Sequence, residues 1–262
     1  SEVDFVEGII FGSDHFVLIL GQFVAYLPEK EKPFNVYDQA WYRFVQDRQN
    51  KRVYFKIKDF LWRWDPDVFW GTAIPGILGW ALNSSFLRKT VLKELLRSDR
   101  LLRLNRFLDN HPVMKLLAVL QKNRRAPLVQ AAGIDIDQCA QFFEWYQNQI
   151  SIYPIWVCPV KISARKKYYP LYEEQGEFVV DIGFYSSKEL KPDMPSNYYN
   201  KLVEKELLKL GAVKGLYSTS FYSWKDFWLA YDEQRYFDVK NKYDPEKVFP
   251  NLYEKVVGKQ TK

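Results

Sequence analysis

The segment Glu177–Tyr185, EFVVDIGFY, carries two side chains that can exchange a proton: the carboxyl group of Asp181 and the phenol of Tyr185. Side chains alternate between the two faces of a β-strand, so Asp181, Gly183 and Tyr185 share one face. A carboxylic acid removed from water, or a phenol, is suited to general acid catalysis. Asp181 and Tyr185 are therefore candidate catalytic residues. The alternative for Asp181 is a carboxylate at the end of a strand, paired with a cation.

Residues for metal or redox chemistry are few. The chain has two cysteines, Cys139 and Cys158, without CxxC spacing, and two histidines, His15 and His111, far apart. This usage excludes a disulfide scaffold and a cysteine-based metal site, so we expect no metal centre. The sequence also lacks the P-loop, GxSxG, HExxH and GxGxxG motifs. Motifs alone therefore do not support a self-contained nucleotide-binding enzyme.

The composition is that of a globular protein with an excess of aromatic residues. The 262 residues are 47% hydrophobic, 27% charged and 18% aromatic, with nine tryptophans. The aromatic excess must lie in a core or on a ring-stacking surface. A net charge of +6 does not indicate nucleic acid, but it favours an anionic membrane surface or a phosphorylated cofactor.

The second half of the chain predicts an α+β domain. Strand patterns and capped helices alternate there as strand, helix, strand, strand, helix, strand, over residues 128–134, 135–149, 151–161, 177–185, 196–211 and 212–222. This is the order of the ferredoxin-like split βαβ fold, an antiparallel sheet with both helices on one face. Pro154 and Pro159 indicate that the strand within Ser151–Lys161 lies at an edge, because proline cannot donate to a sheet ladder.

Four domains are expected along the chain. Residues 1–28 form a β-hairpin, with strand patterns on both sides of the turn GSDH. Residues 29–126 form a helical and aromatic insert, residues 127–222 the ferredoxin-like sheet, and residues 223–262 a set of C-terminal helices. The last of these begins with a capping signature at Ser223 and Asp226.

The insert contains a candidate membrane contact. Val68–Leu87 is uncharged, but Pro75 and three glycines disfavour a spanning helix. Arg88–Leu108 then combines helically spaced leucines with seven Arg or Lys and two acidic residues. An aromatic stretch before a cationic amphipathic helix is typical of a peripheral membrane contact. The alternative is a surface helix packed on an internal loop.

Several segments, in the expected order, resemble the C-terminal half of the FAD-linked oxidoreductases of the vanillyl-alcohol-oxidase type. Within them the chain is most similar to the delta(24)-sterol reductase branch. The resemblance is carried by VDFVEGIIF, FLWRWDPDVFW, YPIWVCP, DIGFY, LYSTSFYSWKDFWLAYD and DPEKVFPNLYEKV.

The resemblance implies that FAD is bound mainly by an N-terminal domain that nothing here matches, with NADPH a candidate electron donor. The hairpin would be the end of the flavin-binding domain, residues 127–222 the cap or substrate domain, and residues 223–262 a return to the flavin domain. The chain begins with Ser1, and we expect it to be an incomplete part of a longer protein that is inactive alone.

Site residues follow from the same resemblance. Tyr217 would lie near the isoalloxazine ring, with Ser220 and Tyr222 as further cofactor contacts. Ser220 stands where some relatives carry a lysine, so lysine-assisted chemistry is not expected. The candidate substrate contacts are Tyr153, Trp156 and Gln130. Tyr153 and Trp156 point to opposite faces of their strand, so only one of the two can line a pocket.

The expected function is hydride transfer through the flavin to or from a carbon–carbon bond of an apolar, sterol- or isoprenoid-like substrate. Asp181 or Tyr185 would deliver the proton that reduction of an alkene requires. Two alternatives remain open: a non-catalytic module that binds lipid or protein, and a flavin oxidase acting on a sugar or alcohol. We expect a location in the cytoplasm or on the cytoplasmic face of a membrane, without secretion, and no nucleic-acid partner.

Overall fold

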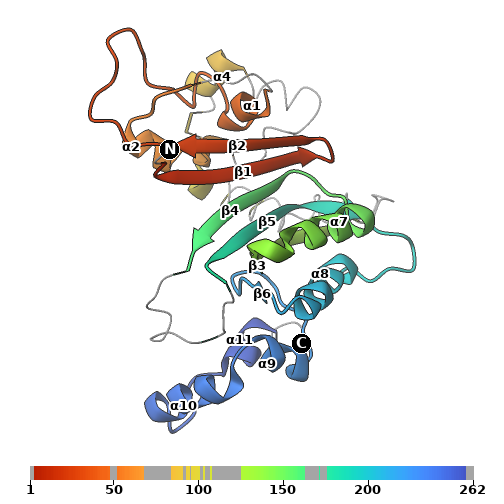
Figure 1. Ribbon diagram of the computed structural model, residues 1–262. Helices are drawn as coiled ribbons and strands as arrows, with labels where there is room; N and C mark the ends of the chain where they lie inside the picture. Colours follow the sequence, from red (N-terminus) through yellow and green to blue (C-terminus); the bar gives the residue numbers. More distant parts are fainter. Residues whose placement is uncertain are drawn as a thin grey trace. The chain divides into compact units, whose positions relative to one another are not determined.

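The computed structural model describes residues 3–47, 52–67, 84–90, 93–94, 96–100, 103, 107, 125–162, 171 and 176–257. The chain divides into two compact units, one formed by Ser1–Gly21 with Asn123–Lys262 and the other by Gln22–Lys122. The first unit contains a β-sheet, and its strands are β1 (Phe5–Gly12), β2 (His15–Gly21), β3 (Arg125–Asp135), β4 (Ile155–Lys161), β5 (Phe178–Glu189) and β6 (Val213–Lys214) (Figure 1).

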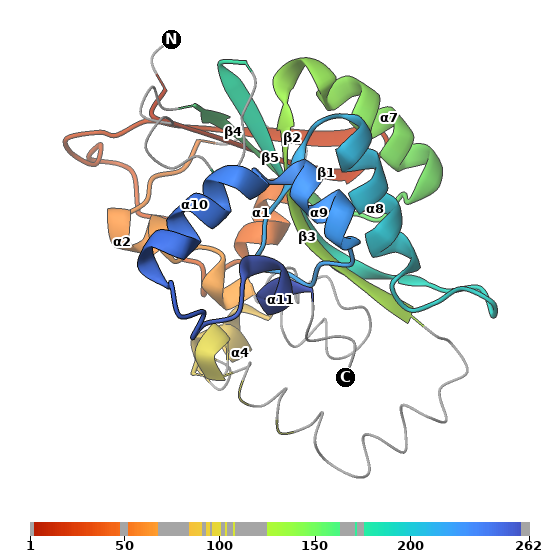
Figure 2. The same ribbon diagram turned by 90° about the horizontal axis from the view of Figure 1, so that it is seen from below.

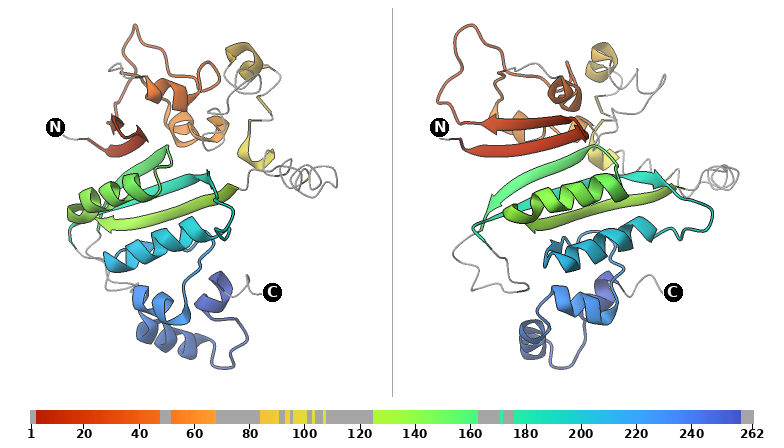
Figure 3. Two further views of the ribbon diagram at one scale, coloured as in Figure 1. Left: turned by 90° about the vertical axis from the view of Figure 1, so that its right-hand side faces the viewer. Right: turned by 45° about the vertical axis from the view of Figure 1, so that its right-hand side comes forward.

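The predicted α+β fold is confirmed. The strands lie in the order β2-β1-β4-β5-β3-β6, and every neighbouring pair is antiparallel. Helices α7 (Cys139–Gln149) and α8 (Tyr198–Lys209) lie on one face of the sheet (Figures 1 and 3). Strands β6, β3, β5 and β4 with these two helices make the ferredoxin-like unit, and the hairpin β1–β2 extends its sheet beyond β4.

The position of β4 differs from the prediction of an edge strand. β4 lies between β1 and β5, because Gly8, Ile9 and Ile10 pair with Val157, Trp156 and Ile155. Its two prolines avoid this contact, since Pro154 precedes the strand and Pro159 lies beyond the last pair with β1. The hairpin therefore shares the sheet of residues 127–222, whereas the sequence had suggested a separate domain.

The core lies between the sheet and its two helices. Val180, Ile182 and Phe184 of β5 are buried there, as their alternation with Asp181 and Gly183 predicts. Phe184 stacks on Tyr146 of α7 with ring centroids 4.9 Å apart. From α8, Val203 and Leu207 complete the same cluster. The opposite face of the sheet carries the odd-numbered residues of β5.

Local signals fix the ends of these helices. The Asp135 side chain accepts a hydrogen bond from the backbone N–H of Asp137 at 2.9 Å, and the short helix η3 (Ile136–Gln138) leads into α7. The helix predicted over 196–211 has its cap at Ser196, whereas in the structure Asn197, one residue later, occupies the N-cap position of α8. Gly211 follows α8 with φ +62°, the left-handed conformation that favours glycine after a helix.

Replacing Gly211 with Ala should lower the free energy of unfolding by about 1 kcal/mol. An added Cβ would meet no atom within 4 Å, so the cost comes from the backbone conformation alone. Gly211→Asn should cost less, because Asn tolerates this conformation better than Ala. Urea unfolding of the three proteins tests the order. An Ala variant as stable as the parent would contradict it.

Three helices end the described part of the chain: α9 (Trp224–Ala230), α10 (Glu233–Tyr243) and α11 (Leu252–Val256). The predicted cap at Ser223 is confirmed, because its hydroxyl accepts from the backbone N–H of Asp226 at 3.1 Å. Helix α9 lies beside α8 (Figure 2). Tyr222, Phe227, Trp228 and Tyr231 form a second buried cluster at this end of the unit.

The unit Gln22–Lys122 has short helices in its described part: α1 (Trp41–Gln46), α2 (Ile57–Leu61), η1 (Asp65–Asp67) and α4 (Ser85–Lys89). Trp41 packs against Phe34, Phe44 and Phe55. The candidate membrane segment falls mostly outside the described residues. Arg88, expected on its cationic face, is buried and donates to the backbone oxygen of Val36 at 2.6 Å. Among the described helices, none has the length and apolar character needed to cross a membrane.

Candidate functional site

The sheet face opposite α7 and α8, which we call the open face, is ordered in rows that cross the strands. Residues directly opposite one another in antiparallel strands point to the same side. One row contains Cys158 of β4, Asp181 of β5 and Gly133 of β3. The next row contains Ile9, Trp156, Gly183 and Ala131, and the row after it pairs Tyr185 with Val129.

The second row is dominated by Trp156, and its members Ile9 and Ala131 are buried. The indole ring lies close to Gly183, where an added Cβ would be 3.3 Å from ring atom Cε3. The indole N–H of Trp156 donates to the carboxylate of Glu7 on β1 at 3.3 Å. The indole ring fills the space above Gly183, and Val179 and Val213 lie where a side chain at position 133 would be. Trp156 thus lies on the open face. It is the one of the pair Tyr153 and Trp156 that lies there.

Asp181 is a half-buried carboxyl group at the centre of its row. Burial raises the pKa of Asp181 above its ordinary value. Within the described part of the chain, no cation or hydrogen-bond donor pairs with its carboxylate, in contrast to the ion-paired alternative considered from the sequence. The group therefore holds its proton to higher pH than an exposed aspartate. This is the behaviour of a general acid.

Tyr217 lies beside Asp181, in the loop that follows β6. Partial burial raises the pKa of Tyr217, and the negative charge of Asp181 raises it further. Its ring packs over Gly215, where an added Cβ would be 3.1 Å from ring atom Cε1 and 3.4 Å from the Cβ of Ala131. The residue is nevertheless 74% exposed, so a ligand can reach the phenol. Tyr185 is also exposed, one row from Gly183.

Four predicted site residues lie elsewhere. Gln130 is fully buried on the helix-covered face, where its amide donates to Asn200 of α8 at 2.6 Å. Tyr153 packs against the core cluster between sheet and helices. Ser220 is buried in the loop after β6, and Tyr222 belongs to the C-terminal aromatic cluster. Gln130 and Tyr153 therefore do not line the open face. A flavin contact of Ser220 or Tyr222 stays a prediction.

Two open-face residues, Glu7 and Cys158, were not predicted as part of a site. Burial raises the pKa of the Cys158 thiol, followed by the charges of Asp181 and Glu7. Glu7 joins the site only through the pairing of β1 with β4. No local sequence signal reports that long-range pairing.

The residues around Asp181 suit a flat ring system better than phosphate or metal. Neither the row of Asp181 nor the next contains a Lys or Arg side chain, so these two rows offer no positive charge to a pyrophosphate group. In the described ranges no three His, Cys, Asp or Glu side chains come together as metal ligands. A ring could lie on Trp156 and the small residues next to it.

Curated proteins of one kind match nearly the whole chain. The delta(24)-sterol reductase of Homo sapiens is 21% identical over 270 residues, which cover 98% of this chain and 48% of that protein. The chain is thus similar in sequence to the delta(24)-sterol reductases. The delta(24)-sterol reductase of Arabidopsis thaliana is 21% identical over 292 residues, covering 96% of this chain and 47% of its own length.

The delta(24)-sterol reductase homolog of Caenorhabditis elegans is 23% identical over 194 residues, or 71% of this chain and 34% of that protein. The resemblance predicted from the sequence is thus confirmed. The chain spans about half the length of the delta(24)-sterol reductases of Homo sapiens and Arabidopsis thaliana. No family model matches the chain, and neither does any solved structure.

Proposed function

We propose that this chain is the C-terminal, substrate-covering portion of an FAD-dependent oxidoreductase that acts on a carbon–carbon double bond of a sterol. The observation that carries the proposal is Asp181, a carboxyl group with a raised pKa and no cation partner in the described structure. It stands on a flat sheet face beside Trp156 and Tyr217. The name of the relatives supplies the substrate class and the position of the double bond.

The residues of the open face fit the ring end of the cofactor and not its phosphate end. Trp156, whose ring lies over Gly183, gives a surface on which a planar ring can rest, while the rows of Asp181 and Trp156 offer no Lys or Arg to a pyrophosphate. We therefore place the phosphate site in an N-terminal domain that this chain does not contain. When bound, the reduced flavin supplies the hydride for the alkene carbon.

This chain contributes binding, orientation and a proton. In its protonated form, Asp181 donates from a carboxyl oxygen to the alkene carbon opposite the one that receives hydride. Trp156 offers apolar ring area to a substrate that is itself apolar. Tyr217 borders Asp181 and limits the position of the bound rings. Tyr185, whose phenol is exposed one row away, is the second candidate donor.

Visible absorbance of bound flavin tests this division of labour. We expect this chain alone to bind no stoichiometric FAD, and a polypeptide extended at its N-terminus to bind about one equivalent. Its reduced flavin should then be reoxidised without oxygen by a sterol with a double bond at carbon 24, and NADPH is the donor to try for its reduction. Tight, stoichiometric FAD on this chain alone would contradict the proposed phosphate site. An extended protein that the sterol leaves reduced would contradict the proposed reaction.

A further inference from the structure

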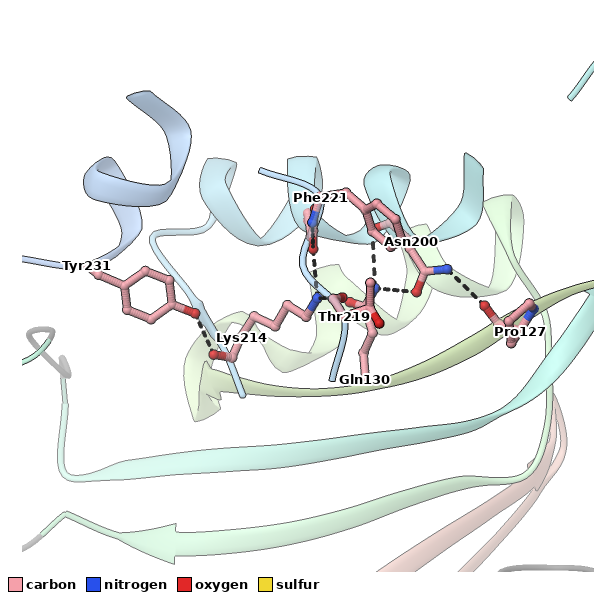
Figure 4. A network of polar contacts seen from close by, with 8 residues as sticks. Pro127, Gln130, Asn200, Lys214, Thr219, Phe221 and Tyr231 are labelled. Carbon is pink, nitrogen blue, oxygen red and sulfur yellow. Dashed lines mark hydrogen bonds and ion pairs between the residues drawn. The ribbon is translucent and has the colours of Figure 1, made fainter. Parts of the chain in front are cut away.

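The loop that carries Tyr217 is tied at both ends to one buried ion pair. Lys214, the last residue of β6, forms a salt bridge with Glu204 of α8, with 2.7 Å between Nζ and Oε1. Both side chains are almost completely buried, with 0% and 3% exposure. Figure 4 shows the ammonium group of Lys214 directed into this network, with Thr219 and Phe221 at its end.

The ion pair also binds the backbone of the loop. The N–H of Phe221 donates to both carboxylate oxygens of Glu204, at 3.0 and 3.1 Å. The ammonium of Lys214 donates to the carbonyl of Thr219. At the start of the loop, the N–H of Gly215 donates to Ala131 at 2.8 Å, and Tyr231 donates its hydroxyl hydrogen to the carbonyl of Lys214 at 2.6 Å. The loop therefore has fixed points before and after Tyr217.

These contacts explain why the predicted strand 212–222 is shorter than expected. Only Val213 and Lys214 belong to β6. Beyond Gly215, backbone groups of Thr219 and Phe221 bond to Lys214 and Glu204, and the loop does not continue the sheet ladder. The ion pair thus binds the backbone of this segment, as a neighbouring strand would do in a longer β6.

The loop connects the two faces of the sheet. Lys214 pairs with Ala132 and points to the helix-covered side, where Glu204 lies. Tyr217 lies on the other side, against Gly215 and Ala131 and beside Asp181. A contact on the covered face can therefore set the position of a phenol on the open face.

A buried ion pair needs a reason other than stability. Its desolvation offsets much of its attraction, and apolar residues of similar volume are often equally stable in its place. Here Glu204 occupies the apolar face of α8, between Val203 and Leu207, where a leucine would extend the core. What apolar residues would not supply are the directed bonds to Thr219 and Phe221.

We propose that Glu204 and Lys214 are positioning residues that hold Tyr217 beside Asp181 and thereby define where a ring rests on the open face. The purpose of this positioning rests on the proposed function, whereas the contacts that hold the loop of Tyr217 do not depend on that function. The adjacent bonds from Gln130 to Asn200 and from Asn200 to the carbonyl of Pro127, at 2.6 and 2.8 Å, hold the same helix on β3 one turn away (Figure 4).

A fluorine label on Tyr217 tests the proposal without flavin or substrate. With 3-fluorotyrosine at position 217 of this chain, the ¹⁹F shift followed against pH gives the pKa of that phenol. Asp181 is the charged group that the structure sets against Tyr217, so Asp181→Asn should lower this pKa. In Glu204→Leu/Lys214→Met the loop loses its ties, so the pKa should fall towards that of the free amino acid although Asp181 is present. Lys214→Arg keeps the ion pair and should keep the pKa raised.

The outcomes separate positioning from mere stability. A folded double variant whose Tyr217 titrates as in the parent would overturn the proposal. If Glu204→Leu/Lys214→Met does not fold, Glu204→Gln/Lys214→Met replaces it, because the Gln side chain keeps an oxygen for the N–H of Phe221. The pKa of Tyr217 in this variant should lie between that of the parent and that of free tyrosine. A pKa equal to that of the parent would again overturn the proposal. If the Tyr217 titration shifts in the double variant but the N-terminally extended parent does not turn over sterol, the result counts against the proposed function alone. If the extended parent turns over sterol but the Tyr217 titration of the double variant is unshifted, the result counts against the positioning role alone.

Discussion

Asp181→Asn should reduce sterol turnover by the flavin-containing, N-terminally extended protein by roughly 10²- to 10⁴-fold, the usual contribution of a general acid. The amide has the size of the carboxyl group but no acidic proton, so binding should change little and turnover should change most. The parent should lose activity as pH rises through the raised pKa of Asp181, because the donor must be protonated. This limb should be absent from the pH profile of the variant.

The same substitution should stabilise the fold near neutral pH. Asp181 has a higher pKa in the folded chain than in the unfolded chain. Its contribution to stability is therefore fully present below the unfolded pKa and is lost as pH rises through the folded pKa. Asparagine does not ionise, so the variant avoids that loss. A raised melting temperature combined with lost activity distinguishes a catalytic carboxyl group from a structural one.

Thermal unfolding from pH 4 to 8, about the range in which an aspartate with a raised pKa titrates, checks the stability effect. Single-turnover reoxidation of the flavin checks the rate. Glu177→Gln is the matched control, since this carboxylate is exposed, forms a surface pair with Lys161 and should affect neither quantity much. Full activity in Asp181→Asn, with a large loss in Tyr185→Phe, would transfer the acid role to Tyr185.

Local patterns in the sequence predicted the parts of this structure that depend on neighbouring residues. Alternation along β5 separated Asp181 and Gly183 from Val180 and Ile182 because side-chain direction has a period of two in any strand. The same rule places Gln130 with Leu128, Ala132 and Ile134 on the covered face. That alternation was present in the sequence, and it argues against Gln130 as a substrate contact.

Contacts between residues far apart in the sequence explain most of the differences between the predicted and the observed structure. β4 is an interior strand only because Ile9, some 150 residues away, pairs with Trp156. Nothing in the segment Ser151–Lys161 indicates this pairing with β1. An edge strand with two prolines would have the same sequence pattern. β6 is short because Glu204 binds the backbone of a loop that follows it. The charge within the apolar face of α8 was visible in the sequence, but its partner Lys214 was not.

Lys214→Met should lower the free energy of unfolding by about 3–5 kcal/mol, the usual cost of leaving one charge of a buried pair uncompensated. Burial raises the pKa of Glu204 and lowers that of Lys214, each opposed by the partner's charge. Without Lys214 the pKa of Glu204 should rise further. Since a carboxyl group with a raised folded pKa favours folding at low pH, the cost of the substitution should shrink as pH falls through that pKa.

Glu204→Leu/Lys214→Met should recover most of this loss, because it removes the remaining charge and fills the space with apolar atoms. Urea unfolding of the parent, both single variants and the double variant at pH 5 and pH 8, about the two sides of the expected titration, gives the coupling energy of the pair. Lys161→Met is the matched control, since the pair of Lys161 with Glu177 is exposed and should contribute less than about 1 kcal/mol. If Lys214→Met cost no more than Lys161→Met at pH 8, Glu204 would have to reach water or another cation, and the loop of Tyr217 would lack the buried support that its position beside Asp181 requires.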